Sequence, residues 1–209
     1  MKELRENLLK QIGARLEPYG FKARRANQSF VRAFPGGRQS CHVSFINHVG
    51  DFDVTTDVAV RLDALQDMIN ADQTFLSKAL KANTYSLGCE LGNLVYGEQH
   101  RWSVLSAADV DKAAEGIAEF FIHHGLPYLE KYSDMEAAFN LIAPHPEQPC
   151  LHSPFEDYRA KRAVGLALLL GKREELPSLI DGHEAILKVR YPHGLQGFRD
   201  FVARYAKQI

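Results

Sequence analysis

The sequence predicts an α+β protein in which an N-terminal helix packs on an antiparallel sheet of about four or five strands, followed by a helical C-terminal half. Three observations support this prediction. Residues 2–17 form an amphipathic stretch that stops at Pro18. Residues 40–61 alternate apolar and polar side chains, as a two-faced β-hairpin does. From residue 106 onward, apolar residues recur at helical spacing.

The composition fits a globular protein of one domain, or of one domain with a helical extension. The chain has 209 residues, and a hydrophobic content of 45% is enough for a core. Cys41, Cys89 and Cys150 are odd in number and widely spaced, so we expect no disulfide framework and a location in the reducing cytoplasm. The longest apolar run, AVGLALLLG, is too short to span a bilayer, and the charged N-terminal stretch is not a signal peptide.

The first helix is expected over Lys2–Glu17, because Pro18 and Gly20 stop it. A strand is expected over Ser29–Phe34, and Pro35-Gly36-Gly37 turns the chain back. The helix has an apolar stripe at the spacing of a core-facing helix. This stripe consists of Leu4, Leu8, Leu9, Ile12 and Leu16.

Residues 40–61 form the predicted hairpin, with Val49-Gly50 as its turn, because glycine accepts a positive φ there. Alternate residues of the second strand then fall on two different faces. The apolar face carries Phe52, Val54, Thr56, Val58 and Val60. The wetter face carries Asp51, Asp53, Thr55, Asp57 and Arg61.

The wetter face supplies the candidate binding site: His42, His48, Asp51, Asp53 and Asp57. The turn places His48 opposite Asp51 and His42 opposite Asp57. The simplest interpretation is a cross-strand ladder of charges. An aspartate could instead orient an imidazole as a general base, or the group could hold a divalent metal. A calcium loop of the EF-hand type is excluded, because the required Gly and Glu are missing at its sixth and twelfth positions.

The next elements alternate between helices and strands. Helices are expected at about 62–70 and 74–80, then a strand from Thr84 that runs into a turn, and a strand at 101–105. The single tryptophan, Trp102, is expected in the core.

Ser106 is expected to cap a helix that ends at His123-His124-Gly125, because cations followed by glycine favour a helix C-terminus. Another helix should run from Leu126 to about Ile142. Gly88 and Gly92 do not form a dinucleotide-binding loop and are expected to allow close packing.

The proline-rich segment 143–155 is the predicted connector between an α+β domain, residues 1–142, and a helical extension, residues 156–209, that packs on it. Three helices are expected in the extension: 156–170, 172–190 and 195–207. The connector contains three possible zinc ligands: His145, Cys150 and His152. Since no fourth ligand stands at a recognisable spacing, an ordered loop is the simpler interpretation.

Charge is distributed unevenly along the chain. Basic residues outnumber acidic ones nine to three in residues 1–40 and ten to seven in residues 151–209, whereas acidic residues outnumber basic ones sixteen to six in between. The acidic middle could attract a basic protein partner, or the basic ends could fold against it and neutralise it.

The motifs of common enzyme classes are missing from the sequence. It contains no GxSxG, P-loop, HExxH or CxxC motif, so we expect no cofactor, no metal and, on balance, no catalysis. A weaker hypothesis is nucleic-acid binding through a basic N-terminal stripe beside aromatic residues. The stripe consists of Lys22, Arg24, Arg25, Arg32 and Arg38, and the aromatic residues are Tyr19, Phe21, Phe30 and Phe34.

The order of several segments resembles a family of uncharacterised bacterial proteins that is defined only as a domain of unknown function. The resemblance covers residues 1–142. It rests on the opening helix with YGFK, the FVRAF strand, the LGNL segment, Trp102 and LPYLEKYSD. It implies an immunity-type or other partner-binding role and supplies no catalytic residues.

We therefore expect a non-catalytic protein-binding module whose basic partner meets the acidic hairpin. The alternative is a small hydrolase or metal-dependent enzyme that uses the same histidines and aspartates. Nucleic acid and membrane are not the expected partners.

Overall fold

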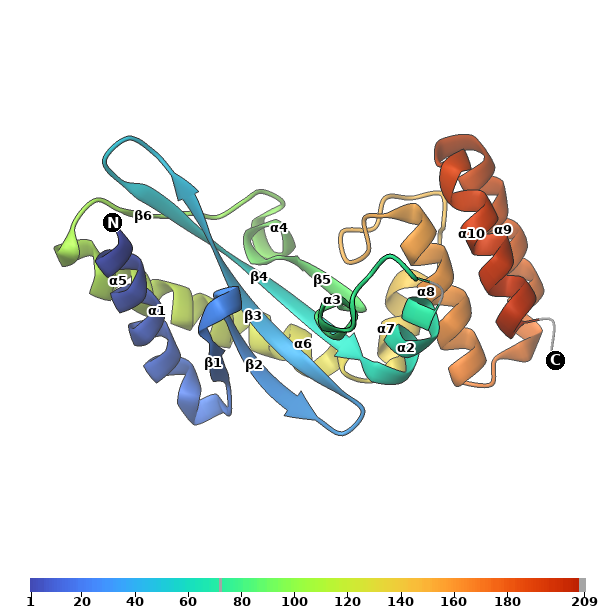
Figure 1. The fold of residues 1–209 in the computed structure, drawn as a ribbon, viewed down its shortest axis with the longest axis horizontal. Helices are drawn as coiled ribbons and strands as arrows, with labels where there is room; N and C mark the ends of the chain where they lie inside the picture. Colours follow the sequence, from blue (N-terminus) through green and yellow to red (C-terminus); the bar gives the residue numbers. More distant parts are fainter. Residues whose placement is uncertain (72, 207–209) are drawn as a thin grey trace. The chain divides into compact units, whose positions relative to one another are not determined.

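The computed structural model describes residues 1–71 and 73–206, and only the backbone of Arg25 (Figure 1). It confirms the predicted α+β fold. The chain forms two compact units. The sheet unit consists of Met1–Val60 and Gly88–Glu130, and the helical unit of Arg61–Leu87 and Lys131–Ile209. These bounds differ from those of the predicted segments, and the proline-rich segment lies inside the helical unit.

Six antiparallel strands form the sheet in the order β1-β2-β3-β4-β5, and β6 also pairs with β4. Their bounds are β1 Lys22–Arg24, β2 Ser29–Phe34, β3 Gly37–Asn47, β4 Phe52–Leu62, β5 Leu87–Glu90 and β6 Trp102–Val104. The strand that the sequence did not predict is β1. Its three residues are too few to show a periodic pattern.

The predicted hairpin turn is confirmed. The His48 N–H donates to the Asp51 carbonyl at 3.2 Å, and Gly50 has a φ of 95°. The two faces of β4 are confirmed as well, because the five residues of its apolar face are inaccessible to solvent. Asp53 and Asp57 on the opposite face are half-buried.

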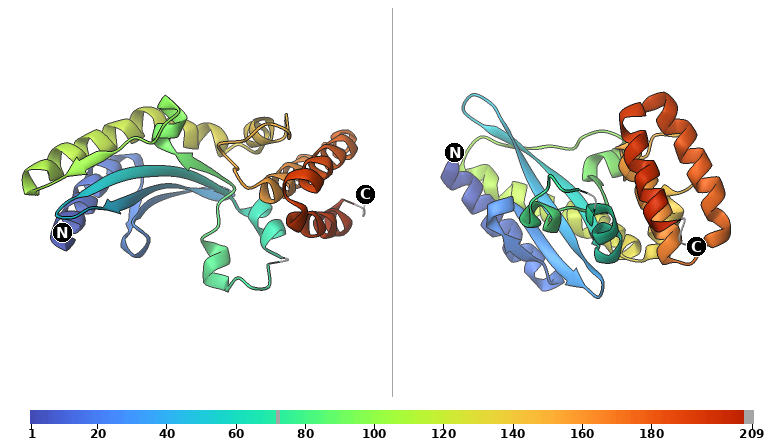
Figure 2. Two further views of the ribbon diagram at one scale, coloured as in Figure 1. Left: turned by 90° about the horizontal axis from the view of Figure 1, so that it is seen from above. Right: turned by 45° about the vertical axis from the view of Figure 1, so that its right-hand side comes forward.

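Two helices cover the apolar face of the sheet: α1, Lys2–Leu16, and α5, Ala107–Phe120 (Figures 1 and 2). The α1 stripe is buried at Leu8, Ile12 and Leu16. Gly13 lets α1 approach the sheet closely, because a Cβ at this position would lie 3.1 Å from the Phe30 ring. A short 3-10 turn, η1, Glu17–Tyr19, follows α1, and a second, η2, Arg25–Asn27, follows β1.

The helix after Ser106 does not end at Gly125, so that prediction was wrong. It continues through a π-helical turn, η3, Phe121–Gly125, into α6, Leu126–Tyr132. Pro127 explains the wide turn, because proline lacks an N–H and its ring clashes with the carbonyl four residues earlier. Gly125 is instead a packing residue: a Cβ there would lie 2.7 Å from the Phe121 ring and 3.0 Å from Val58.

The helical unit is organised around α8, Glu156–Leu169, which packs against four other helices. These are α2 Asp63–Ala71, α7 Met135–Ile142, α9 Leu176–Arg190 and α10 Pro192–Tyr205; the unit also contains α3 Lys78–Ala82 and the 3-10 turn η4 Arg173–Glu175. Gly171, with a φ of 72°, makes the predicted break after α8. The expected helix over Leu126–Ile142 is in fact two helices, because Asp134 caps α7 by accepting the Ala137 N–H at 2.8 Å.

Arg159 of α8 fixes the proline-rich segment. Its buried guanidinium donates to the carbonyls of Ile142, Pro144, His145 and Gln148 at 2.6–3.1 Å. These hydrogen bonds satisfy backbone groups that would otherwise be costly to bury. Among the described residues, no helix is both long enough and apolar enough to cross a membrane.

We predict that Gly125→Ala lowers the free energy of unfolding by about 2 kcal/mol, because the added methyl group overpacks the contact with Phe121 and Val58. Gly182→Ala in α9 is the control, since its Cβ has room at 3.4 Å from Pro146 and should stabilise that helix by about 1 kcal/mol. Urea denaturation of both variants measures the difference. Equal effects would contradict the packing role of Gly125.

A second prediction concerns the buried His183 in α9. Burial lowers the pKa of His183 to about 4, and nearby Arg159 acts in the same direction. The unfolded chain therefore takes up this proton first, and stability that is complete above pH 6.5 falls as the pH drops toward 4. The loss amounts to up to about 3 kcal/mol. His183→Gln should lose less stability over this range in acid-titrated urea denaturation, and parallel pH curves for the two proteins would contradict the assignment.

Candidate functional site

Asp53 is the best-connected residue of the predicted site. Its carboxylate accepts the Ser103 hydroxyl of β6 at 2.6 Å, lies 3.1 Å from His48 Nε2 and lies 3.7 Å from Arg101. The hydrogen bond from Ser103 lowers the pKa of Asp53, with His48 and Arg101 as smaller causes, against the opposing effect of burial. The backbone turn does place His48 opposite Asp51, but the imidazole contacts Asp53 diagonally.

Asp57 occupies a drier part of the same face. Burial raises the pKa of Asp57; Glu90 adds to this effect, and His42 opposes it. The Ser44 hydroxyl donates to Asp57 at 3.4 Å, and Thr55 donates to Glu90 at 2.7 Å. Glu90 is a member of this polar face that the sequence did not single out, because it comes from β5, far along the chain.

The five predicted residues do not form a recognisable catalytic or metal centre. Within residues 1–71 and 73–206, no three His, Cys, Asp or Glu side chains are placed to hold a metal ion. Cys41 points to the other face, and burial raises the pKa of its thiol. None of the five residues lines the groove between α1 and β1 or the hollow beside Phe155 and Tyr191.

A cluster of aromatic side chains lies around β6, the strand that pairs with the start of β4. The sequence did not predict this cluster. It brings together α4 (Leu91–Tyr96), β6, α5 and η3 through five residues: Tyr96, His100, Trp102, Phe120 and His124. The Tyr96 and Phe120 rings stack at 5.6 Å, with 14° between their planes. His100 stands edge-on to Trp102 at 4.4 Å, and His124 contacts Phe120 at 5.0 Å. We call these five residues the aromatic cluster.

The helix α4, Leu91–Tyr96, presents Tyr96, although the sequence predicted a turn here. The carboxylate of Glu90 caps it by accepting the backbone and side-chain N–H groups of Asn93 at 2.7 and 2.8 Å. Glutamate is not among the preferred capping residues, so the helix start was missed. Gly97, with a φ of 76°, ends α4 and turns the chain toward His100.

Two glycines hold the cluster together. At Gly92 in α4, a Cβ would lie 2.2 Å from the backbone nitrogen of His100, so the loop can cross the helix only at glycine. This confirms the expectation that Gly92 allows close packing. At Gly116 in α5, a Cβ would lie 2.9 Å from Trp102 Nε1. Because glycine has no Cβ, both positions leave the space in which aromatic side chains of the cluster pack.

The aromatic cluster reaches the surface. Trp102 is half-buried rather than in the core, so that prediction was wrong; its ring packs against His100 and Phe120. Tyr96 is 57% exposed. Large aromatic residues with one solvent-facing side are typical of protein interfaces.

The predicted basic stripe is divided between the two faces of the sheet. Lys22 and Arg24 are exposed on β1, but the register of β2 places Arg32 on the opposite face. There Arg32 lies over the Phe21 ring and donates to Gln39 and Glu130. Phe21 and Phe30 are buried and cannot stack bases, and the side chain of Arg25 lies outside the described part of the structure.

The possible zinc ligands of the proline-rich segment are separated as well. His145 pairs with Glu147 at 3.4 Å. His152 faces the Tyr132 ring, and burial lowers its pKa. His152 therefore packs within the loop, whereas the exposed His145 forms a surface ion pair.

Comparisons with family models, curated proteins and solved structures give no match for this chain. The resemblance noted in the sequence stays a prediction. Only the geometry of the molecule itself therefore bears on its function.

We predict that Gly116→Ala displaces Trp102 and shifts its fluorescence emission to longer wavelength, because the added Cβ would lie 2.9 Å from Nε1. Trp102 is the only tryptophan, so the emission reports this site alone. Glu115→Ala, at the exposed neighbouring position, should leave the spectrum unchanged. Identical spectra for both variants would show that Gly116 does not hold the indole in place.

Proposed function

We propose that this protein is a non-catalytic protein-binding module that holds its partner through the aromatic cluster. The observation that carries the proposal is the exposed Tyr96 ring, stacked on Phe120 and supported by His100. Tyrosine and tryptophan dominate the binding energy of many interfaces. A ring that is already fixed in place loses little conformational entropy when it is buried.

We propose a basic partner, because the exposed face of the Tyr96 ring attracts a cation. An arginine or lysine side chain is attracted to the face of an aromatic ring. The exposed Glu98 follows Tyr96 by two residues in the chain, and its negative charge favours a cationic partner as well. The candidate site predicted from the sequence is less suited to binding a basic partner, since its Asp53 already has three partners in the fold. Asp51 and Asp57 remain candidate contacts.

This role needs no chemistry of its own. A protein that covers a basic functional surface of a cytoplasmic partner would act as an inhibitor, and the immunity-type role implied by the family resemblance is one form of it. The alternative, a small hydrolase or metal-dependent enzyme built on His42, His48, Asp51 and Asp57, has less support. The Ser44 hydroxyl on this face donates to Asp57 and not to an imidazole that could activate it.

The test starts with capture of the tagged protein's partner from its native lysate at low and high salt. The retained protein is then purified, and its dissociation constant is measured directly. We predict that Tyr96→Ala weakens binding at least about 30-fold, as truncation of a central aromatic contact does. High salt should also weaken the complex, because a basic partner is attracted electrostatically.

Tyr191→Ala is the matched control, since Tyr191 is similarly exposed at 45% but lies in the helical unit. It should bind like the unmodified protein. Charge reversal at Asp51 and Asp57 tests the candidate site predicted from the sequence separately. Unchanged affinity in Tyr96→Ala, together with a loss in the aspartate variants, would move the binding site to the sheet face. Unchanged affinity in every variant would overturn both assignments.

A further inference from the structure

Strand β1 leaves one edge of the sheet open. It stands at the end of the strand order, and β2 is its only strand partner among the described residues. All three of its residues, Lys22, Ala23 and Arg24, are exposed. The unpaired backbone groups of such an edge can hydrogen-bond to an added strand.

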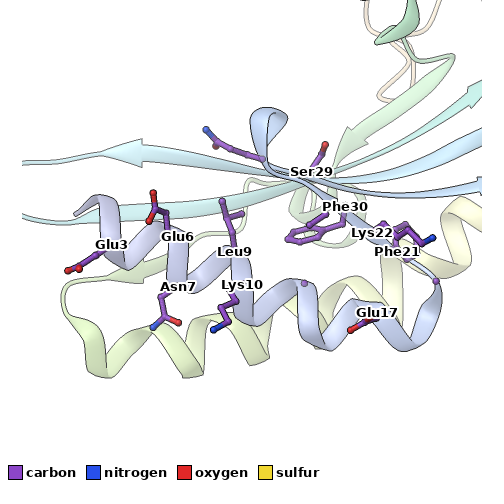
Figure 3. A pocket seen from close by; sticks show the side chains of 14 residues that line it. Glu3, Glu6, Asn7, Leu9, Lys10, Glu17, Phe21, Lys22, Ser29 and Phe30 are labelled. Atoms are coloured by element: carbon purple, nitrogen blue, oxygen red, sulfur yellow. The ribbon is translucent and has the colours of Figure 1, made fainter.

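The register assigns the three side chains of β1 to two faces. Ala23 pairs with Phe30, whose ring lies against Gly13 of α1, so Ala23 is on the face toward α1. Lys22 and Arg24 are on the opposite face, because successive side chains of a strand alternate. Figure 3 shows this alternation on β2, where Phe30 points toward α1 and Ser29 points away from it.

A groove of about 990 Å³ runs between α1 and this edge (Figure 3). Its apolar wall is formed by Leu9, Phe21, Ala23 and Phe30. Its polar lining consists of Glu3, Glu6, Asn7, Lys10 and Glu17 on α1, and of Lys22, Gln28 and Ser29 at the strand edge. Ala23 is the smallest side chain on β1, so the groove is open beside the strand edge.

We propose that β1 and this groove bind an extended segment of a partner protein with an acidic, an apolar and an acidic residue in succession. The segment would add a strand to β1. Its two acidic side chains would lie beside Lys22 and Arg24, where opposite charges on neighbouring strands attract. Its apolar side chain would project to the other face, past Ala23 and into the groove. This site is separate from the aromatic cluster and goes beyond the function proposed above.

The charges of the molecule favour this occupant over two others. In a two-fold pairing of β1 with a second copy, Lys22 would face Arg24 of the other chain, and like charges opposite each other repel. A basic segment would meet the same repulsion. The glutamates of α1 do not oppose an acidic segment, because they lie on the groove side, whereas the acidic side chains would project to the opposite face.

The test uses three synthetic nine-residue peptides, labelled with fluorescein, in anisotropy titrations with the full-length protein. The first has Asp-Phe-Glu at its centre. The second has Lys-Phe-Lys, and the third has the first peptide's residues in the order Phe-Asp-Glu, which exchanges the faces of Phe and Asp. We expect the first peptide to bind at least about tenfold more tightly than either control.

Two variants of the protein complete the test. Lys22→Glu with Arg24→Glu should invert the preference, so that the Lys-Phe-Lys peptide binds more tightly than Asp-Phe-Glu. Ala23→Trp should abolish binding by filling the groove, and unchanged thermal unfolding would show that the fold is retained. Exchanging exposed charges leaves the core intact, so the inversion does not depend on a loss of folding.

Three results would overturn the proposal. The first is equal binding of the three peptides. The second is an unchanged preference in the charge-exchanged protein. The third is concentration-dependent self-association of the unmodified chain that Ala23→Trp abolishes, since this would make a second copy the occupant of the edge. None of these results depends on the aromatic cluster, so the two binding sites are tested independently.

Discussion

The register of the β3–β4 hairpin is the constraint on which the sheet unit depends. Because side chains alternate along a strand, a slip of one residue would bring the buried Phe52, Val54 and Val58 to the polar face and turn Asp53 and Asp57 toward α1 and α5. The turn at Gly50 fixes this register locally. The same long strand then pairs with β6 and β5, which positions Trp102 and Glu90. The aromatic cluster therefore depends on a turn that it does not touch.

Sequence charge alone says little about the charge that a partner would encounter. Within the two units, basic residues from the ends of the chain pair with carboxylates of the acidic middle: Arg15 with Asp111, Arg32 with Glu130, and Lys172 with Glu136. Such exposed pairs contribute little to stability, but they neutralise charge. These contacts favour self-neutralisation over one large acidic surface. A partner would then recognise individual features, such as the exposed Tyr96 ring or the two cations on the strand edge.

Both proposed binding surfaces are built from short elements on a rigid support. Tyr96 comes from a six-residue helix, Trp102 from a three-residue strand, and Lys22 and Arg24 from another three-residue strand. None of these elements would be stable alone. Glycines at positions 92, 116 and 13 leave room for His100, Trp102 and Phe30, which lie in or beside these elements. These short elements are thus ordered by close packing against their neighbours, and not by their own length.

The sequence by itself determined the elements whose signals are local: α1, β2, the hairpin with its turn, and the start of α5. Their periodicity, turns and caps lie within a few residues. Only the tertiary structure decided the rest. Strand β1 forms because β2 offers it a partner. His48 contacts Asp53 because Ser103 and Arg101 fix that carboxylate. Pro127 is accommodated by a π-helical turn. Tyr96, Trp102 and Phe120 meet because three elements converge at two glycines. Such contacts depend on distances between residues far apart in the chain, which no local pattern records.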